Sequence, residues 1–292
     1  MIRTDISGHT KLICLLGSPV GHSLSPLMHN TAFQQLGLDY AYLCFDVDEN
    51  GLETAVAGLK RLGVRGFNLT MPDKNAVVPL CDSLSPAARL IGAVNTVVND
   101  RGILTGHNTD GVGFWRSALD YGFRPAGRKC VILGAGGAAS AIAVQGALDK
   151  LAELKIFARK SSRFHERTLK ILDGITRETS CKAGLFDLEE KEQLQDAVAS
   201  ADILINATPV GMEPDTDHSL IQDTSCFRPD LTVADVIYHP QKTLLLAQAK
   251  QAGCNIFNGM DMLLYQGAEA FRLWTGQDMP VDSVRKVLDF SR

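Results

Sequence analysis

Residues 128–148, RKCVILGAGGAASAIAVQGAL, place a short apolar run directly before a glycine-rich turn and a run of small residues. The apolar run is typical of a buried strand, and the small residues after it are typical of a helix that packs closely on a sheet. Gly134, Gly136 and Ala139 give the turn the spacing G-x-G-x-x-A. A strand that passes through such a turn into a helix predicts a parallel α/β domain.

The rest of the chain repeats this alternation of short apolar runs and longer segments of helical period. Strands are predicted at residues 11–17, 40–48, 64–70, 130–137, 154–160, 201–209, 231–238 and 254–259. Helices are predicted at residues 25–37, 49–63, 138–151, 161–175, 243–253, 260–277 and 280–290. Because strands and helices alternate, we expect mostly parallel sheets with helices on both faces.

A chain of 292 residues has room for two domains, each with its own core. Between residues 106 and 130 a predicted helix leads into a turn that contains Gly and Pro, and a new strand then begins. We therefore place a domain boundary at residues 112–127. The predicted fold class is two-domain α/β, with an N-terminal, mostly parallel α/β domain and a Rossmann-like domain after it.

Composition excludes several classes of protein. The net charge is −4 and the basic residues are dispersed, so nucleic acid is not an expected partner. The N-terminal apolar run is too short to span a bilayer, and Asp5 and Lys11 interrupt any signal-peptide pattern, so we expect no membrane partner and a cytoplasmic location. Seven scattered cysteines without a C-x-x-C pair predict neither a disulfide framework nor a metal site.

The glycine-rich turn predicts a bound dinucleotide. The first glycine makes the tight turn, the second lets the backbone approach a pyrophosphate, and the helix N-terminus faces the anion. The candidate cofactor residues of this turn are Gly134, Ala135, Gly136, Gly137 and Ala138. The alternative is a glycine-rich turn without a ligand, which the flanking strand and helix make less favourable.

The end of the following predicted strand bears on the choice between NAD and NADP. An NAD site usually has an acidic residue there for the ribose 2′-hydroxyl, but this strand end reads LKIFARKSSRF. Arg159 and its basic neighbours would suit a 2′-phosphate, and Ser161 would suit a hydrogen bond to it. Charge therefore favours NADP, with a solvated basic turn as the alternative.

Groups for proton transfer and hydroxyl binding appear in the N-terminal half. VRGFNLTMPDKNAV ends a predicted strand near Thr70 and presents Lys74 after a Pro turn, where ligands of open α/β sheets bind. Lys74 alone is equally consistent with a solvated charge. Asp110 in GHNTDG is either a partner of Lys74 or a helix cap, and Asn95 in GAVNTVVND either bonds a substrate hydroxyl or finishes a turn.

Taken together, these motifs resemble the shikimate dehydrogenase family, and most closely its quinate/shikimate dehydrogenase branch. The matching stretches are GSPVGHSLSPLMHN, RGFNLTMPDK, GAVNTVVND, GHNTDG, GAGGAASA, INATPVGM, DVIY and NGMDMLLYQGAEAF. They follow the order of the family over nearly the whole chain. The resemblance implies a substrate-binding catalytic domain of residues 1–112 with 260–292, and a dinucleotide-binding domain of residues 113–259.

The resemblance also implies roles for individual residues. Ser23 and Ser25 would bind a substrate carboxylate, and Lys74 and Asp110 match the catalytic pair of the family. The ring hydroxyls of the substrate would be bound by Thr70, Asn95, Asp110 and Gln266. The cofactor would also contact Thr208 and Gly259. The tetrapeptide SLSP occurs twice, at 23–26 and 83–86, and the family gives no such role to the second copy, so Ser85 is expected to be only a helix cap.

The chain departs from the family pattern at two places. Ala158 stands before Arg159 where NADP-preferring members have Asn, and Ser161 follows where NAD-accepting members tend to have Asp, so NADP and NAD both remain open as cofactors. Asp73, next to Lys74, adds a carboxylate that faces either the site or the solvent.

The implied function is the NAD(P)-dependent interconversion of shikimate and 3-dehydroshikimate, with quinate and 3-dehydroquinate as a second pair, in aromatic amino acid biosynthesis through the chorismate pathway. Two alternatives remain open. One is a dehydrogenase of an amino-substituted quinate or shikimate analogue, and the other is a sensor that binds nucleotide or shikimate without turnover. A homodimer is the oligomeric state that we consider.

Overall fold

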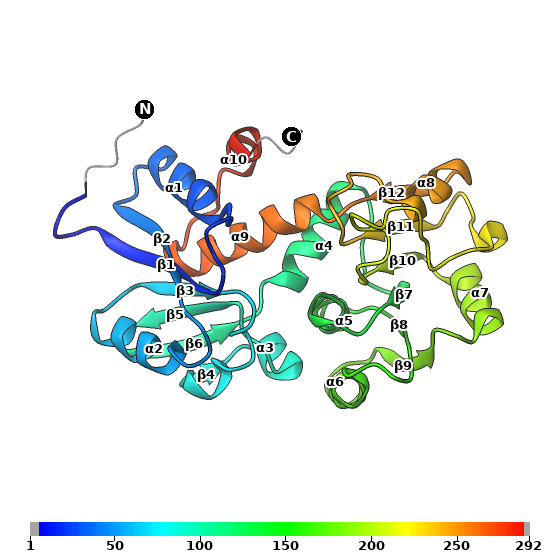
Figure 1. Ribbon diagram of the computed structural model, residues 1–292, viewed down its shortest axis with the longest axis horizontal. Helices are drawn as coiled ribbons and strands as arrows, with labels where there is room; N and C mark the ends of the chain where they lie inside the picture. The colour runs from blue at the N-terminus through cyan, green and yellow to red at the C-terminus, as the bar shows by residue number, and fades with distance from the viewer. Residues whose placement is uncertain (1–5, 289–292) are drawn as a thin grey trace. The chain divides into compact units, whose positions relative to one another are not determined.

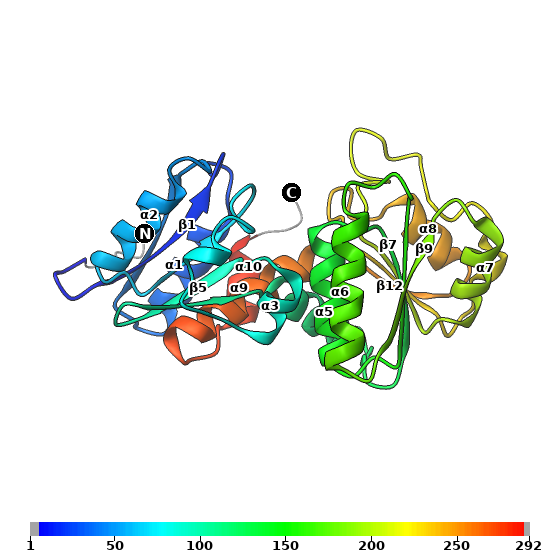
Figure 2. The same ribbon diagram turned by 90° about the horizontal axis from the view of Figure 1, so that it is seen from below.

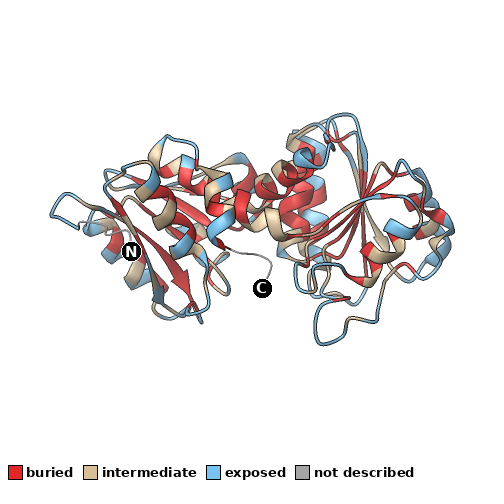
Figure 3. Ribbon diagram, turned by 90° about the horizontal axis from the view of Figure 1, so that it is seen from above, coloured by how far each residue is buried: buried red, intermediate tan, exposed pale blue. Residues whose placement is uncertain are grey.

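The computed structural model describes residues 6–288 and divides into two compact units. The first unit combines Met1–Thr109 with Leu264–Arg292, and the second unit is Asp110–Leu263. Each unit has its own six-stranded sheet with helices on both faces (Figure 1). Buried positions concentrate on the strands and on the helix faces that cover them (Figure 3). The predicted two-domain α/β class is thereby confirmed.

The sheet of the first unit is mostly parallel. Its strands are β1 (Lys11–Gly17), β2 (Tyr40–Asp46), β3 (Gly66–Leu69), β4 (Ser83–Leu84), β5 (Thr96–Asp100) and β6 (Ile103–His107), in the order β2-β1-β3-β5-β6-β4. β5 is antiparallel to both of its neighbours, whereas the other pairs are parallel. The amino end of β5 therefore lies at the same edge as the carboxyl ends of β1, β3 and β6, which we call the carboxyl edge of the first sheet.

Helices cover both faces of this sheet. They are α1 (Ser25–Gln35), α2 (Leu52–Arg61), α3 (Pro86–Ile91), α9 (Met260–Thr275), α10 (Val281–Leu288) and the short 3₁₀ helix η1 (Val78–Leu80). α1, α9 and α10 lie on one face, and α2 and α3 lie on the other (Figure 1). Trp274 of α9 is fully buried and donates from Nε1 to the carbonyl oxygen of Val97 at 2.9 Å. A side chain at Gly66 would overlap this indole, so glycine is needed there.

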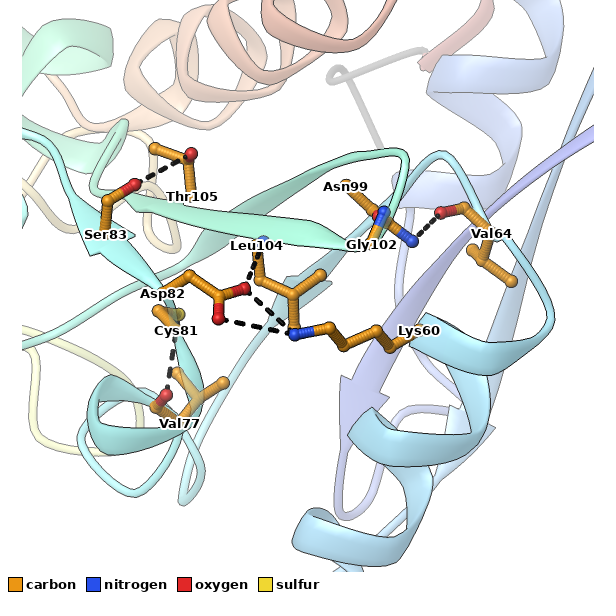
Figure 4. Close-up of polar contacts among 10 residues, drawn as sticks. All are labelled: Lys60, Val64, Val77, Cys81, Asp82, Ser83, Asn99, Gly102, Leu104 and Thr105. Atoms are coloured by element: carbon orange, nitrogen blue, oxygen red, sulfur yellow. Dashed lines mark hydrogen bonds and ion pairs between the residues drawn. The ribbon is translucent and has the colours of Figure 1, made fainter.

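A group of hydrogen bonds fixes the β6 side of the same sheet (Figure 4). The Asp82 carboxylate accepts from the backbone N–H of Leu104 at 2.7 Å and from Lys60 Nζ at 3.0 Å. Asn99 donates from Nδ2 to the Val64 carbonyl oxygen at 2.8 Å. These contacts attach the loop before β4 and the helix α2 to the hairpin of β5 and β6.

The sheet of the second unit is parallel throughout. Its strands are β7 (Lys129–Leu133), β8 (Glu153–Ala158), β9 (Lys182–Asp187), β10 (Ile203–Asn206), β11 (Thr232–Asp235) and β12 (Asn255–Phe257), in the order β12-β11-β10-β7-β8-β9. This is the strand order of a Rossmann-like fold, in which the order of strand addition reverses between the parallel neighbours β7 and β10. Ligands of such sheets bind outside the carboxyl ends of the strands at that reversal.

Helices again lie on both faces of the second sheet. They are α4 (Asp110–Asp120), α5 (Gly137–Leu148), α6 (His165–Glu178), α7 (Lys191–Ser200), α8 (Leu244–Gln251) and the short 3₁₀ helix η2 (Thr224–Cys226). α5 and α6 cover one face, and α7 and α8 cover the other (Figure 2). α4 packs closely on α5, since side chains at Gly111 or Gly146 would overlap Ala141 or Trp115. Trp115 completes this contact by donating from Nε1 to the Ile142 carbonyl oxygen at 2.9 Å.

The structure adds elements that the sequence pattern did not predict: the hairpin of β5 and β6, the helix α7, and strand β9. The helix predicted at 280–290 begins at Val281 and is described to Leu288, and the remainder lies outside the described residues. Within residues 6–288, no helix has the length and apolar character that crossing a membrane requires. In the same range, no group of three or more His, Cys, Asp or Glu is placed to hold a metal ion.

Candidate active site

The two copies of SLSP begin helices in different ways. Ser85 is the N-cap of α3, and its hydroxyl accepts from the Ala88 N–H at 3.3 Å, which confirms the expected cap. In the first copy the N-cap of α1 is Leu24, without a side-chain cap, and Ser23 Oγ accepts from the Ser25 N–H at 3.2 Å. The Ser25 hydroxyl is a hydrogen-bond partner of the Tyr42 phenol. The serines of the first copy are therefore not used as the cap of their helix.

The loop after β3 carries Thr70 and Lys74 at the carboxyl edge of the first sheet. Thr70 donates its N–H to the Leu16 carbonyl oxygen at 3.0 Å, and its methyl group occupies the space that a side chain at Gly17 would need. The carbonyl oxygen of Lys74 accepts from the Val94 N–H at 2.7 Å. The loop is thus held by its backbone, beside the residue that precedes Asn95.

Asn95 is buried at the same edge because β5 runs antiparallel. Its Oδ1 accepts from the Thr109 N–H at 2.8 Å and from the Thr96 hydroxyl at 3.0 Å, and its Nδ2 donates to Thr109 Oγ1 at 2.9 Å. Thr109 is followed directly by Asp110, the first residue of α4. Asn95 therefore fixes the backbone from which Asp110 emerges, a role that the sequence did not indicate.

Asn68, which with Thr70 ends the predicted strand before Lys74, is hydrogen-bonded to Tyr42, a residue that the sequence did not predict as part of the site. Tyr42 is fully buried and donates from its hydroxyl to Asn68 Oδ1 at 2.7 Å, and Asn68 Nδ2 donates to the Asn95 carbonyl oxygen at 2.9 Å. Burial is the main reason that the pKa of Tyr42 lies well above its usual value, so the phenol stays protonated as a donor. The sequence shows Tyr42 and Asn68 as polar residues within two largely apolar strands, but only the order and register of the strands show that their side chains meet.

Asp73 is buried, so the solvent-facing alternative for this carboxylate is wrong. Burial raises the pKa of Asp73, and the nearby charges of Glu49 and Asp48 raise it further.

Gln266 lies on α9, which packs against α1 so closely that a side chain at Gly267 would overlap Met28. The helices that carry Ser25 and Gln266 are thus in direct contact.

The glycine-rich turn of the second unit has the shape that a pyrophosphate needs. Gly134 has φ +104°, and a Cβ there would lie 2.8 Å from Thr208 Cγ2 and 2.9 Å from the Ala207 carbonyl oxygen. Around Gly136 and Gly137, by contrast, a Cβ would meet no atom of the described residues within 4 Å. The N-cap of α5 is Gly136, without a side-chain cap. First-turn N–H groups next to open space fit an anionic group, so the turn from Gly134 to Ala138 fits a dinucleotide.

The three basic side chains of the turn after β8 have different surroundings. Lys160 Nζ lies 3.1 Å from Asp187 Oδ2, and this carboxylate raises the pKa of Lys160. The Arg163 guanidinium lies over the Phe164 ring, 4.7 Å from its centroid. Arg159 lines an open pocket of about 790 Å³ together with residues of α7 and the segment 219–223. Of the three cations, Arg159 is therefore the best candidate for a phosphate, next to Ser161.

Thr208 and Gly259 lie at the carboxyl ends of β10 and β12, which are separated by β11 in the second sheet. Thr208 donates its hydroxyl to Asn206 Oδ1 at 2.7 Å, and Asn206 Nδ2 donates to both oxygens of Asp235 at 3.1 Å. Gly259 donates its N–H to the Ile237 carbonyl oxygen at 3.2 Å, and a side chain at Gly259 would overlap the Val236 carbonyl. The sequence did not predict Asn206 or Asp235, which connect these loops.

The strand order of the second sheet and the open glycine turn define a dinucleotide-dependent enzyme. The first unit is a separate α/β unit, and it carries polar side chains that are candidates for binding a hydroxylated substrate. Residues 15–97 match the family model described as the shikimate dehydrogenase substrate binding domain, and residues 259–288 match the shikimate 5'-dehydrogenase C-terminal domain. The chain belongs to the shikimate dehydrogenase family, as the following similarities establish.

Curated and solved relatives match nearly the whole chain. The shikimate dehydrogenase (NADP(+)) of Listeria innocua is 49% identical over 287 residues, which is 98% of each chain. A crystal structure of shikimate 5-dehydrogenase from Listeria monocytogenes in complex with shikimate and NAD matches with a TM-score of 0.95 and 48% identity, covering 98% of this chain and 99% of that one. The quinate dehydrogenase of Corynebacterium glutamicum, in complex with NAD, matches with a TM-score of 0.83 and 33% identity, covering 96% and 98%.

Proposed function

We propose that this protein is an NAD(P)-dependent dehydrogenase that interconverts shikimate and 3-dehydroshikimate, with quinate and 3-dehydroquinate as a second pair. The observation that carries the proposal is the carboxyl edge of the first sheet, where Thr70, the Lys74 loop and Asn95 are held together by backbone hydrogen bonds. The shikimate dehydrogenases that match almost the whole chain support it. The division of labour would be substrate binding and catalysis by residues 1–112 with 260–292, and dinucleotide binding by residues 113–259.

The proposed substrate contacts follow from the chemistry of the side chains. Hydroxyl groups of Ser23 and Ser25 are suited to a carboxylate because each can donate a charge-assisted hydrogen bond. Hydroxyl, amide and carboxylate groups are suited to the several hydroxyls of a cyclic polyhydroxy acid. This second set comprises Thr70, Asn95, Asp110 and Gln266.

The proposed chemistry is oxidation of one ring hydroxyl to a ketone, and its reverse. When bound, NAD or NADP would accept the hydride in the oxidation, and the reduced cofactor would donate it in the reverse direction. Lys74 takes the hydroxyl proton as the ketone forms, and in the reverse direction its ammonium gives a proton to the developing alkoxide. Asp110 orients the Lys74 ammonium and the reacting hydroxyl. The turn from Gly134 to Ala138 holds the pyrophosphate.

A direct assay tests the function. Purified protein is mixed with shikimate or quinate, each with NAD and with NADP, and reduction of the nicotinamide is followed by absorbance. We expect turnover with shikimate, and the four combinations rank the acids and the cofactors. Tight binding of shikimate without turnover would instead support the sensor, and turnover of an amino-substituted analogue alone would support the analogue enzyme.

The repeated SLSP provides a matched pair of variants. Ser25→Ala is expected to raise KM for shikimate roughly tenfold, because a hydrogen bond to a charged carboxylate contributes about 1.5 kcal/mol or more. Ser85→Ala is expected to lower the free energy of unfolding by about 1 kcal/mol through loss of the cap, without a change in KM. Steady-state kinetics and urea unfolding of both variants check this. Equal effects of the two variants on KM would contradict the assignment of Ser25.

Cofactor choice is tested at the turn after β8. Arg159→Ala is expected to raise KM for NADP by roughly tenfold to 100-fold while changing KM for NAD little, because only NADP carries the 2′-phosphate. Arg163→Ala is the control, since the Arg163 guanidinium is stacked on Phe164. The ratio of the two KM values is the readout. An equal rise for NAD and NADP would show that Arg159 does not read the 2′-phosphate.

We also propose a cytoplasmic location and a homodimer, with shikimate and quinate as the small-molecule partners. Light scattering of the purified protein across a range of concentrations tests the oligomer. A mass of 31.6 kDa at all concentrations would identify a monomer and contradict the homodimer.

A further inference from the structure

Asp235 is a fully buried carboxylate at the carboxyl end of β11. It accepts from Asn206 Nδ2 at 3.1 Å to each oxygen, from the Ile237 N–H at 3.0 Å, and from the Thr243 hydroxyl at 2.8 Å. Burying a carboxylate is costly unless hydrogen bonds compensate. Three donors make four hydrogen bonds to this one side chain, so it joins three separate segments of the second unit.

The first of these segments is the loop of residues 207–210, the Thr208 loop. Asn206 donates to Asp235 with its amide nitrogen, so its amide oxygen faces the other way and accepts from the Thr208 N–H at 3.1 Å and the Thr208 hydroxyl at 2.7 Å. Asn206 Nδ2 also donates to the Val210 carbonyl oxygen at 3.1 Å. Asp235 therefore fixes which end of the Asn206 amide points at Thr208.

The second segment is the turn of residues 236–237, which lies against Gly259. Asp235 accepts from the Ile237 N–H, and the Ile237 carbonyl oxygen accepts from the Gly259 N–H. The contact with Val236 is so close that only glycine fits at position 259. The third segment is the start of α8, where Thr243 is the N-cap and accepts from the Leu246 N–H at 3.4 Å.

These segments lie on one side of the strand reversal. Arg159 follows β8, the neighbour of β7 on one side, whereas the Thr208 loop and Gly259 follow β10 and β12 on the other side. A dinucleotide spans such a reversal, with its pyrophosphate at the turn after the central strand. With the adenosine ribose at Arg159, the nicotinamide half extends over the Thr208 loop and Gly259.

We propose that Asp235 is a positioning residue that holds the Thr208 loop and the Gly259 turn in the arrangement that binds the nicotinamide half of the dinucleotide. This inference rests on the proposed function. Asp235 acts through Asn206 and Ile237 and has no direct contact with the cofactor in this scheme. Its effect is confined to one half of the ligand.

Asp235→Asn is the most informative variant because it preserves shape and changes hydrogen bonding. An amide at position 235 places its N–H₂ group beside Asn206 Nδ2 in either orientation, because Asn206 Nδ2 lies 3.1 Å from both oxygens of Asp235. The same N–H₂ group also faces the Ile237 N–H in one orientation and the Thr243 hydroxyl in the other. Relief at Asn206 requires rotation of the amide, which would then present N–H₂ to the Thr208 N–H. In either orientation Asn206 Nδ2 keeps at most one neutral acceptor in place of two carboxylate oxygens, so the anchor of the Thr208 loop is expected to weaken. Asn206→Ala removes the same bridge but leaves the bonds from Ile237 and Thr243 to Asp235, so it provides a second variant if Asp235→Asn does not fold.

The test compares two ligands on the full-length protein by isothermal titration calorimetry. One is NADP or NAD, whichever the wild type binds more tightly, and the other is ADP, which has the adenosine half and the phosphates but no nicotinamide. In Asp235→Asn and in Asn206→Ala, Kd for the dinucleotide is expected to rise roughly tenfold or more, as for a misplaced binding group, with Kd for ADP changed less than about twofold. Asp202→Asn is the control, because its carboxylate bonds Arg128 and the Lys129 N–H at the amino ends of the strands.

The outcomes separate this inference from the proposed function. A selective loss of dinucleotide affinity in the Asp235 and Asn206 variants supports it. Equal weakening of ADP and dinucleotide would indicate a general structural role, and unchanged dinucleotide affinity in both variants would show that the loop needs no such anchor; either result overturns the inference while wild-type turnover stands. A wild type that binds neither NAD nor NADP would overturn the proposed function, and this inference with it.

Discussion

Replacing Lys74 with alanine is expected to lower kcat for shikimate oxidation by roughly 10²- to 10⁴-fold, the usual contribution of a general acid or base. The loss should be chemical rather than structural. The Lys74 loop is held through its backbone, by the bond from the Val94 N–H to the Lys74 carbonyl and by the Asn75 side chain on the Gly92 carbonyl at 2.7 Å. Alanine keeps both contacts. Initial rates with saturating shikimate and NADP measure the change.

Lys60→Ala is the matched control for this prediction. Lys60 is another lysine of the first unit, partly exposed and paired with Asp82 at 3.0 Å (Figure 4). Such a surface pair contributes about 1 kcal/mol or less to stability, so Lys60→Ala should keep wild-type kcat. If folded Lys74→Ala turned over shikimate at the wild-type rate, the role assigned to Lys74 would be wrong.

The second large effect concerns stability at acid pH and the buried residue His29. This imidazole has no exposed surface and stacks on the Tyr42 ring, with 4.6 Å between centroids, and on Phe271 at 6.2 Å. Neither ring nitrogen has a hydrogen-bond partner among residues 6–288. Burial lowers the pKa of His29 from 6.5 to about 3. The folded protein therefore keeps this side chain neutral at any moderate pH.

Between pH 6.5 and about 3 the unfolded chain protonates His29 and the folded protein does not. The unfolded state then binds more protons, so the free energy of unfolding falls as the pH drops through this window. At about 1.4 kcal/mol per pH unit, the full difference is about 5 kcal/mol. Above pH 6.5 His29 is neutral in both the folded and the unfolded state, so it causes no loss of stability there. The other titratable groups of the chain are the same in the wild type and in any variant at this position.

His29→Leu is expected to remove this part of the pH dependence. Urea unfolding of the wild type and the variant at a series of pH values gives the free energy of unfolding of each. The difference between them should move steadily in favour of the variant as the pH falls below 6.5, because leucine has no proton to bind. Parallel curves for the two proteins would show that His29 titrates normally in the fold.

Local sequence was sufficient for the elements with continuous apolar runs. β1, β7 and β10 are buried on both faces, and their sequences show it. β9 was missed because it is an edge strand whose residues are exposed or only partly buried, with Gly184 in its centre. The hairpin of β5 and β6 was missed because TVVNDRGILTGH mixes polar and apolar residues without a clear period. Edge and hairpin strands are specified by pairing as much as by burial.

The site shows the same division. The spacing of Gly134, Gly136 and Ala139 predicted a dinucleotide turn because the glycine spacing that such a turn requires is visible in the local sequence. The pairs Tyr42–Asn68 and Asn206–Asp235 join strands that are distant in sequence, so their contacts depend on sheet order and register. The sequence showed polar residues within apolar strands, and the fold was needed to show which of these residues form hydrogen bonds with one another.

The first unit is built from two separated parts of the chain, and this has a consequence for synthesis on the ribosome. The face of β1 and β2 on which α1 packs with Phe33 is also covered by residues of α9 and α10. Arg65 Nε donates to the Trp274 carbonyl oxygen at 2.8 Å. A nascent chain that ends before α9 has made both sheets but leaves this apolar face in water. The contiguous residues 110–263 can complete their own core first, so the part of the protein that is made first finishes folding last.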